Sequence, residues 1–172
     1  GASNRALALA TGEFVSPLDH DDSLTEDALY EVVKRLQTDP APDFLYSDHD
    51  IKDPTGRRVS PMFKPDWSPD LMLSMNYVTH FATYRRDLVV KVGGYRKGFE
   101  GSQDFDLILR VSEQTKRIVH IPKPLYSWGQ APASVSNNPQ AKPYAHEAGK
   151  RALVEAMARR GQKAEVVDGP GA

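Results

Sequence analysis

The residues of this sequence whose types and spacing could do chemistry begin with an acidic run, Asp19-His20-Asp21-Asp22, directly after the apolar stretch 14–18. Adjacent carboxylates repel one another and are costly to desolvate, so such a run usually faces water, accepts backbone N–H groups or binds a cation. On an extended segment the side chains of Asp19 and Asp21 project to the same side. Two converging carboxylates suit Mg²⁺ or Mn²⁺, which take oxygen ligands and often share their other positions with water and substrate phosphates.

The same run has structural alternatives. Asp22 or Ser23 could cap the helix that follows, which is a common role for these residue types. An EF-hand is excluded by spacing, because counting from Asp19 puts Tyr30 at the twelfth position, where that loop needs a bidentate Glu. Taken alone, the metal site and the helix cap are equally good interpretations of the run.

Two further acidic segments follow. Asp48-His49-Asp50 comes after the apolar run 44–47 and could supply a second set of metal ligands, although a solvated turn at the end of a strand is the preferred interpretation. Asp104 and Asp106 lie at the beginning of segment 102–114, which has the wide apolar stripe of a largely buried helix. Because the helix dipole favours negative charge in the first turn, the residues alone favour a structural role for Asp104.

Composition limits the class of protein. The length of 172 residues fits one domain, and 40% hydrophobic with 26% charged residues is typical of a folded globular chain. Lys and Arg number 22 against 23 Asp and Glu, so no global basic field favours nucleic acid as a partner. The absence of cysteine excludes disulfides, thiolate catalysis and Cys-ligated zinc.

The hydropathy pattern contains no apolar window near the roughly 20 residues that span a bilayer, and the N-terminus lacks the layout of a signal peptide. We therefore expect a cytoplasmic protein without a transmembrane segment. Residues 4–10 already resemble the inside of a helix, so we expect the chain to begin partway into a fold.

Composition and the pattern of apolar and turn residues predict an α/β or α+β domain over residues 1–167 and a linker-like tail over 168–172. A Ser23/Glu26 capping box begins helix 23–38, which carries apolar residues at helical spacing, namely Leu29, Val32, Val33 and Leu36. The other predicted helices are 4–11, 69–73, 86–92, 102–114 and 144–160. The predicted strands are 13–18, 44–47, 80–84, 118–121, 125–128 and 163–167. Turn residues in segment 50–63 indicate a hairpin or an irregular excursion. Segment 131–143 is expected to be a polar loop.

The order of short motifs along the chain resembles that of the family 2 glycosyltransferases with a GT-A fold. The resemblance covers about residues 4–167. It is carried by Asn4-x-Ala6, Ala10-x-Gly12-Glu13-Phe14-Val15, Leu18-Asp19-His20-Asp21-Asp22, Tyr46-Ser47-Asp48, Asn76-Tyr77-x-x-His80, Gly93-Gly94-Tyr95 and Gly101-Ser102-Gln103-Asp104-Phe105-Asp106-Leu107.

The resemblance implies an incomplete, Rossmann-like GT-A domain with a mixed sheet flanked by helices. It implies that Asp19 and Asp21 hold Mn²⁺ or Mg²⁺ against the diphosphate of a nucleotide sugar, with Asp22 as an additional contact. Asp104, after Gln103, matches the family's catalytic base. A base is needed because the acceptor hydroxyl must lose its proton as it attacks the anomeric carbon, and the expected outcome is inversion.

Other residues are expected to contact the substrates. Trp67, Asn76 and His80 lie in polar and aromatic segments between the two main motifs, and Gln103 precedes the base. Each of the first three could equally be a packing or buried polar residue. Gly94 either lets the backbone approach the donor sugar or only ends a helix.

Two departures from the family pattern limit what the resemblance implies. Relatives often carry His and Arg where this chain has Ser127 and Gly129. The family's first strands and helices, which hold the nucleotide, have no counterpart before residue 4. We therefore expect a fragment that is inactive or very weak alone, and whose unpaired strand edges favour self-association.

The resulting functional hypothesis is an inverting, metal-dependent glycosyltransferase. It would pass a sugar from a nucleotide-sugar donor to a glycan or lipid-linked acceptor in polysaccharide biosynthesis, in the cytoplasm or at the inner face of the membrane. The first alternative is a non-catalytic carbohydrate-binding or assembly module derived from the fold. The second is a metal-dependent phosphoesterase, which requires Asp19 and Asp48 to converge on one metal.

Overall fold

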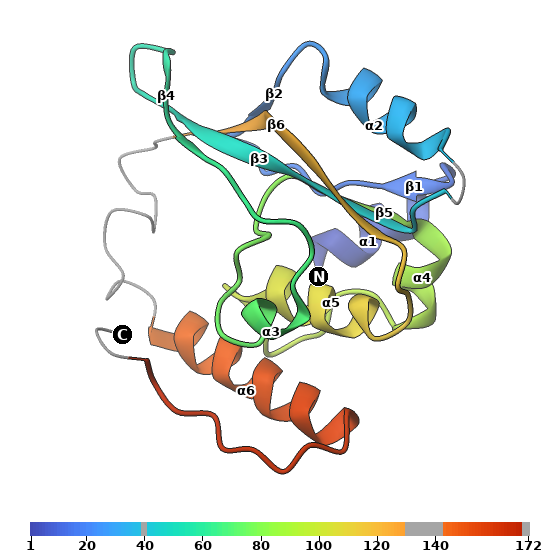
Figure 1. The fold of residues 1–172 in the computed structure, drawn as a ribbon, viewed down its shortest axis with the longest axis vertical. Coiled ribbons are helices and arrows are strands. Elements are labelled where there is room, and N and C mark those ends of the chain that lie inside the picture. Colours follow the sequence, from blue (N-terminus) through green and yellow to red (C-terminus); the bar gives the residue numbers. More distant parts are fainter. Residues whose placement is uncertain (39–40, 130–142, 170–172) are drawn as a thin grey trace.

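The chain folds into one mixed sheet with helices on both faces (Figure 1). The structure, a computed structural model, describes residues 1–38, 41–129 and 143–169. The strand order is β1-β5-β3-β6-β2, and β4 pairs with β3. The strands are β1 (Phe14–Val15), β2 (Ser23–Leu24), β3 (Phe44–Lys52), β4 (Arg58–Met62), β5 (Ala82–Arg85) and β6 (Ile118–Gly129). The helices are α1 (Ala2–Leu9), α2 (Ala28–Leu36), α3 (Pro69–Met72), α4 (Arg86–Lys91), α5 (Gln103–Ser112) and α6 (Pro143–Arg159).

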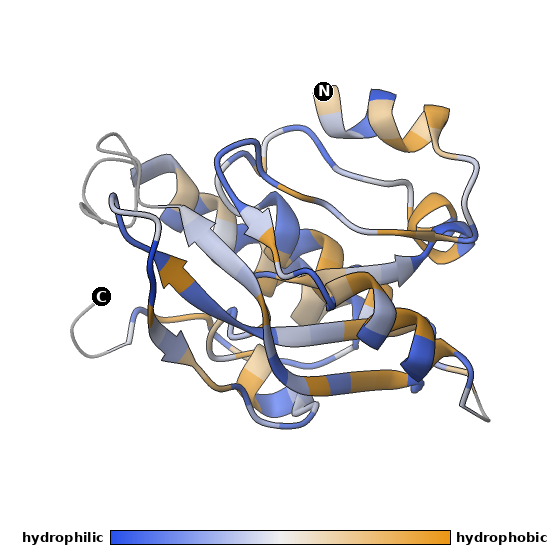
Figure 2. Ribbon diagram, turned by 90° about the horizontal axis from the view of Figure 1, so that it is seen from above, coloured by the Kyte–Doolittle hydropathy of each residue, from blue (hydrophilic) through white to orange (hydrophobic). Residues whose placement is uncertain are grey.

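Two hydrophobic clusters lie on opposite faces of the sheet. Phe44 and Tyr46 of β3 face the cluster that packs against α5 and α6, whereas Leu45, between them, faces the cluster under α2. This alternation follows from the two-residue period of a strand. In Figure 1, α2 covers one face, while α5 and α6 lie on the other. Figure 2 shows α1 at the periphery, and none of its residues is buried.

Strand β3 is the centre of the sheet and is longer than predicted. It pairs in parallel with β6 and antiparallel with β4 and β5. The expectation of a solvated turn at Asp48-His49-Asp50 is wrong, because these residues continue the strand and are 1%, 3% and 4% exposed. Polar partners from neighbouring segments allow this burial: Asp48 contacts His120, and Asp50 accepts a 2.6 Å hydrogen bond from Arg58 Nε.

The predicted capping box is also wrong. Ser23 belongs to β2, where it pairs with Ser127 of β6, and α2 begins after Asp27. The buried residues of α2 are Ala28 and Val32, whereas Leu29 and Val33, expected on the apolar face, are exposed. Strand pairing with β6 therefore outweighed the local helix signal.

Strands 118–121 and 125–128 form one continuous strand, β6. Its register with β3 passes from Ile121 opposite Ser47 to Pro124 opposite Asp48, so the prolines lie at a bulge instead of a turn. Among the described residues, 163–167 form no strand. Most of the predicted loop 131–143 lies outside the described residues.

The remaining predicted elements are confirmed within a few residues of their expected ends. Helices occur at α1, α3, α4, α5 and α6, and β3 and β4 form the predicted hairpin. Ser68 Oγ caps α3 by accepting a 3.2 Å hydrogen bond from the Leu71 N–H, with Pro69 at the first helical position. In the part of the chain that the structure describes, no helix has the length and apolarity needed to cross a bilayer.

The buried face of α5 gives a stability prediction. Leu109 is 0% exposed, whereas Leu29 on α2 is 65% exposed. We expect Leu109→Ala to lower the free energy of unfolding by about 2–5 kcal/mol, because it removes buried contacts and leaves a cavity. The matched control Leu29→Ala should change it by less than about 0.5 kcal/mol. Urea denaturation of the chain measures both, and equal losses would contradict the assigned helix face.

Candidate functional site

A cavity of about 470 Å³ lies where the loop after β1, segment 76–80, the beginning of α5 and the end of β6 meet. A second cavity of about 430 Å³, bordered by α1, shares five of its lining residues. Five residues singled out from the sequence line the first cavity: Asp19, Asn76, His80, Gln103 and Asp104. The cavity therefore brings together two motifs that are more than 80 positions apart in the chain.

Two residues that line the cavity, Asp19 and His80, belong with Asp22 to a group that could hold a metal ion. One ligand atom each from Asp19, Asp22 and His80 lies within 4.8 Å of the others. The Asp22 carboxylate accepts a hydrogen bond from the Tyr126 hydroxyl and a 2.7 Å hydrogen bond from the Gly129 N–H. The His80 ring stacks on Tyr126, with ring centroids 4.9 Å apart. Two carboxylates and an imidazole are a suitable ligand set for a divalent cation.

The backbone explains why Asp22, rather than Asp21, joins this group. The Asp22 N–H donates to the Asp19 carbonyl oxygen at 3.2 Å, so the segment is a turn that brings residues three apart together. On an extended segment Asp19 and Asp21 would have converged. Asp21 instead contacts His20, with 3.6 Å between Nδ1 and Oδ1. Gly129 admits this turn, because a Cβ there would lie 2.1 Å from the Asp21 carbonyl oxygen.

Asp104, in the first turn of α5, also lines this cavity. Asn76 Nδ2 donates to Asp104 Oδ2 at 2.9 Å, while Asn76 Oδ1 accepts from the Thr79 N–H at 3.2 Å. The amide is therefore held in one orientation, and Asp104 Oδ1 has no hydrogen-bond partner among the described residues. Gln103 Oε1 accepts a 2.7 Å hydrogen bond from the Gly101 N–H, which ties it to the loop before the helix.

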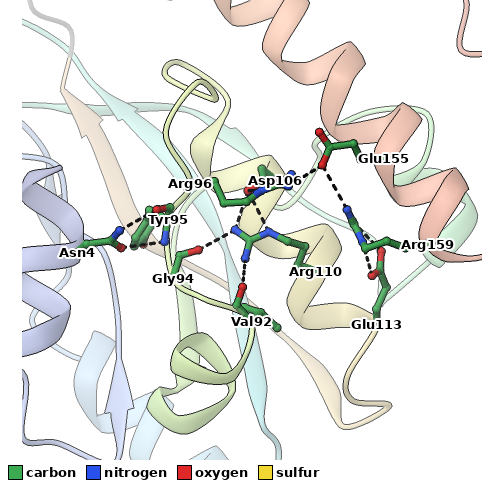
Figure 3. Close-up of polar contacts among 10 residues, drawn as sticks. All are labelled: Asn4, Val92, Gly94, Tyr95, Arg96, Asp106, Arg110, Glu113, Glu155 and Arg159. Atoms are coloured by element: carbon green, nitrogen blue, oxygen red, sulfur yellow. Dashed lines mark hydrogen bonds and ion pairs between the residues drawn. The ribbon is translucent and has the colours of Figure 1, made fainter.

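A buried ion pair on α5 contacts the segment that leads to Tyr95 (Figure 3). Asp106 binds Arg110 one turn later and also Arg96, and it is 0% exposed. The Arg110 guanidinium donates at 2.7 Å to the carbonyl oxygens of both Val92 and Gly94. The pair therefore fixes the turn that ends α4.

This turn presents Tyr95 to both cavities. The Asn4 side chain donates to the Tyr95 carbonyl at 2.8 Å and accepts from its N–H at 2.9 Å. Gly94, at φ +65°, leaves room for this contact, since a Cβ there would lie 2.7 Å from Asn4 Oδ1. Burial, and then the charges of Asp104 and Asp19, raise the pKa of Tyr95 to about 12. Its hydroxyl therefore stays protonated at neutral pH.

The two tryptophans have different places. Trp67 is absent from the residues that line the cavity and packs with Phe44 and Tyr46, at 6.0 and 6.4 Å between ring centroids. Trp128 does line the cavity, 5.7 Å from the His80 ring. Sequence reasoning missed Trp128 as a site residue, although an aromatic residue at the end of a predicted strand was a usable signal.

The second acidic segment does not join the candidate metal group in the described residues. Asp48 Oδ1 lies 2.8 Å from His120 Nε2 and accepts from the Lys64 N–H at 2.9 Å. The three converging ligands include no atom of Asp48. The convergence of Asp19 and Asp48 that a phosphoesterase requires is therefore not observed. Ser127 is 3% exposed and lies in the β2–β6 pair rather than in the cavity.

The fold is that of an α/β domain with a mixed sheet flanked by helices, and comparison with known protein families gives its class. Residues 1–93, more than half of the chain, match the family model described as glycosyl transferase family 2. The chain belongs to this family.

Two curated relatives are similar over nearly the whole chain. It is 45% identical over 172 residues to the uncharacterized protein y4gI of Sinorhizobium fredii, covering 98% of this chain and 19% of that protein. It is 44% identical over 165 residues to the O-antigen biosynthesis protein RfbC of Myxococcus xanthus. That match covers 96% of this chain and 13% of RfbC. The chain thus spans less than a fifth of the length of these relatives.

The fold resembles a solved structure of S. aureus TarS 1-349 in complex with UDP-GlcNAc. The TM-score is 0.66 at 20% identity, over 90% of this chain and 45% of that chain. The expected GT-A fold with a mixed sheet flanked by helices is confirmed.

The ion pair beside the cavity gives a pH-dependent prediction. Burial opposes ionisation of Asp106, but hydrogen bonds from Arg96 and then Arg110 outweigh it and hold its pKa below the ordinary value. We expect Asp106→Asn to lower the free energy of unfolding by about 3–5 kcal/mol at pH 7, because two arginines lose their anionic partner. A carboxylate whose pKa is lower in the folded state stabilises the fold at pH values above its unfolded-state pKa. This contribution is lost as the pH falls through the folded-state pKa.

Urea unfolding of wild type and variant between pH 7 and pH 3 measures this difference. The deficit of Asp106→Asn should be constant above about pH 5 and shrink below about pH 4. A deficit that is independent of pH over this range would contradict the assigned ion pair.

Proposed function

We propose that this chain forms the metal-binding and catalytic part of an inverting, metal-dependent glycosyltransferase. One observation carries the proposal: Asp19 and His80 of the Asp19–Asp22–His80 group line the same cavity as the Asp104–Asn76 pair. Metal-dependent inverting transfer needs a cation for the leaving diphosphate and a base for the attacking hydroxyl within reach of one donor sugar. Family membership supports the same reaction class.

Asp19, Asp22 and His80 would hold Mn²⁺ or Mg²⁺, and the imidazole favours Mn²⁺, since Mg²⁺ prefers oxygen ligands. Such a cation supplies Lewis-acid stabilisation of the negative charge on a departing nucleoside diphosphate. Asp21 remains a prediction from the sequence as a further ligand. Tyr126 and the Gly129 N–H orient Asp22, as the outer partners of a metal ligand do.

Asp104 would act as the general base. The hydrogen bond from Asn76 occupies Oδ2 and leaves Oδ1 to accept the proton of the acceptor hydroxyl. Asn76 is then a residue that orients the base, in place of the direct substrate contact expected from the sequence. Trp128 offers an aromatic face beside His80 on which a sugar ring could stack.

The donor would be a nucleotide sugar and the acceptor a glycan or a lipid-linked glycan, in polysaccharide biosynthesis. The name of the Myxococcus relative, which specifies O-antigen biosynthesis, supports this role, and the UDP-GlcNAc complex of TarS supports the donor class. We propose that the protein acts in the cytoplasm or at the inner face of the membrane, where nucleotide sugars are available.

The base assignment predicts that Asp104→Asn lowers turnover about 10²–10⁴-fold while donor binding is retained, because the amide cannot take the acceptor's proton. Asp87→Asn is the matched control, since Asp87 also lies in the first turn of a helix but its side chain is 85% exposed. Sugar transfer by the full-length protein, with a panel of UDP-, GDP- and dTDP-sugars as donors, measures both variants. Normal turnover by Asp104→Asn would defeat the assignment.

The metal group predicts an order of effects on Mn²⁺ affinity. Asp22→Asn and His80→Ala should each weaken Mn²⁺ binding by about tenfold or more, whereas Asp21→Asn should have the smaller effect, because its carboxylate lies outside the converging group. Isothermal titration of the full-length protein with Mn²⁺, with and without UDP, measures the affinities. A larger loss of affinity for Asp21→Asn would favour Asp19 and Asp21 as the metal ligands. Glycan binding that needs no metal, without sugar transfer, would favour the carbohydrate-binding alternative.

A further inference from the structure

Lys64, between β4 and α3, makes contacts that the proposed reaction does not use. Its ammonium donates to the carbonyl oxygens of Ser47 at 2.5 Å and Val78 at 2.6 Å, and also to that of His80. The three N–H donors of a lysine are thereby matched by three carbonyl acceptors. Its backbone N–H is held by Asp48 Oδ1 at 2.9 Å, so both ends of the residue are anchored to other segments.

The position of this ammonium is energetically unusual. Burial lowers the pKa of Lys64 to about 7, against the opposing charge of Asp48. An apolar side chain of similar volume would avoid the desolvation cost, so a lysine here adds directed hydrogen bonds rather than stability alone. Those bonds join β3 to the segment that precedes β5.

The segment that Lys64 holds has a backbone that needs support. Thr79 has φ +39°, which a β-branched residue rarely adopts. Lys64 donates to the carbonyl oxygens of the two residues that flank Thr79, Val78 and His80. The Thr79 N–H in turn donates to Asn76 Oδ1. An unfavourable conformation of this kind persists only where its surroundings fix it, and such places cluster at functional sites.

The same segment supplies two residues that line the cavity, Asn76 and His80. Asn76 reaches Asp104, and His80 reaches the group formed with Asp19 and Asp22. A shift of the carbonyls that Lys64 holds would therefore move a candidate metal ligand.

We propose that Lys64 is a positioning residue, which holds the Val78 and His80 carbonyls so that the His80 imidazole meets the two carboxylates. The inference rests on the proposed metal-dependent function. Lys64 touches no reacting atom in this assignment and acts through His80. A purely structural lysine would contribute to folding but would not change Mn²⁺ affinity in the folded protein.

Lys64→Met tests the proposal, because it keeps an unbranched side chain, one atom shorter, and removes all three donors. In the full-length protein we expect Mn²⁺ binding, measured by titration calorimetry with UDP present, to weaken roughly 10- to 100-fold, the effect typical of groups that orient a ligand. Lys116→Met at an exposed lysine is the matched control and should bind as wild type does. Circular dichroism and thermal unfolding establish that each variant is folded at the titration temperature.

A double-mutant cycle separates positioning from general stabilisation. In a His80→Ala background, Lys64→Met should have little further effect on Mn²⁺ affinity, since the ligand that it positions is already absent. Additive losses, or wild-type affinity for Lys64→Met, would overturn the proposal. If Lys64→Met does not fold, Lys64→Gln carries the same comparison with fewer donors lost. A wild-type protein that neither binds Mn²⁺ nor transfers sugar would overturn the proposed function, and this inference with it.

Discussion

The parallel pairing of β3 with β6 is the constraint on which the rest of the structure depends. It runs from Phe44 opposite Ile118 to Lys52 opposite Gly129, with bulges midway. The last residues of β6 reach the cavity, where Tyr126 and Gly129 hold the acidic turn and Trp128 lies beside His80. A shift of one residue in this register would turn these side chains to the other face, because strand side chains alternate.

Polar groups, more than apolar contacts, set the geometry around the cavity. The Asp106–Arg110 pair fixes the turn before Tyr95, and Lys64 fixes the segment that carries His80. Buried charges of this kind contribute little net stability, since desolvation offsets their attraction. Their directed hydrogen bonds instead select one backbone arrangement. The hydrophobic clusters on both faces of the sheet supply the stability that this arrangement requires.

Local signals predicted most elements but failed where a strand partner intervened. Helices α5 and α6 were predictable because apolar residues at helical spacing are among those that they bury. Ser23 reads as a helix cap and Asp48 as part of a turn, yet both became strand residues. In each case the partner is β6, about 70 or more residues further along the chain, and pairing over that distance leaves no local pattern.

The sequence by itself determined the residue types of the site, the order of its motifs and the membership of the chain in a transferase family, because these depend on composition and spacing alone. Only the tertiary structure decided which of those residues meet. The turn at Asp19 brings its carboxylate near the Asp22 carboxylate and the His80 imidazole, and Asn76 donates to Asp104. The physical reason is that convergence depends on backbone direction, which is set by hydrogen bonds to distant strands and helices.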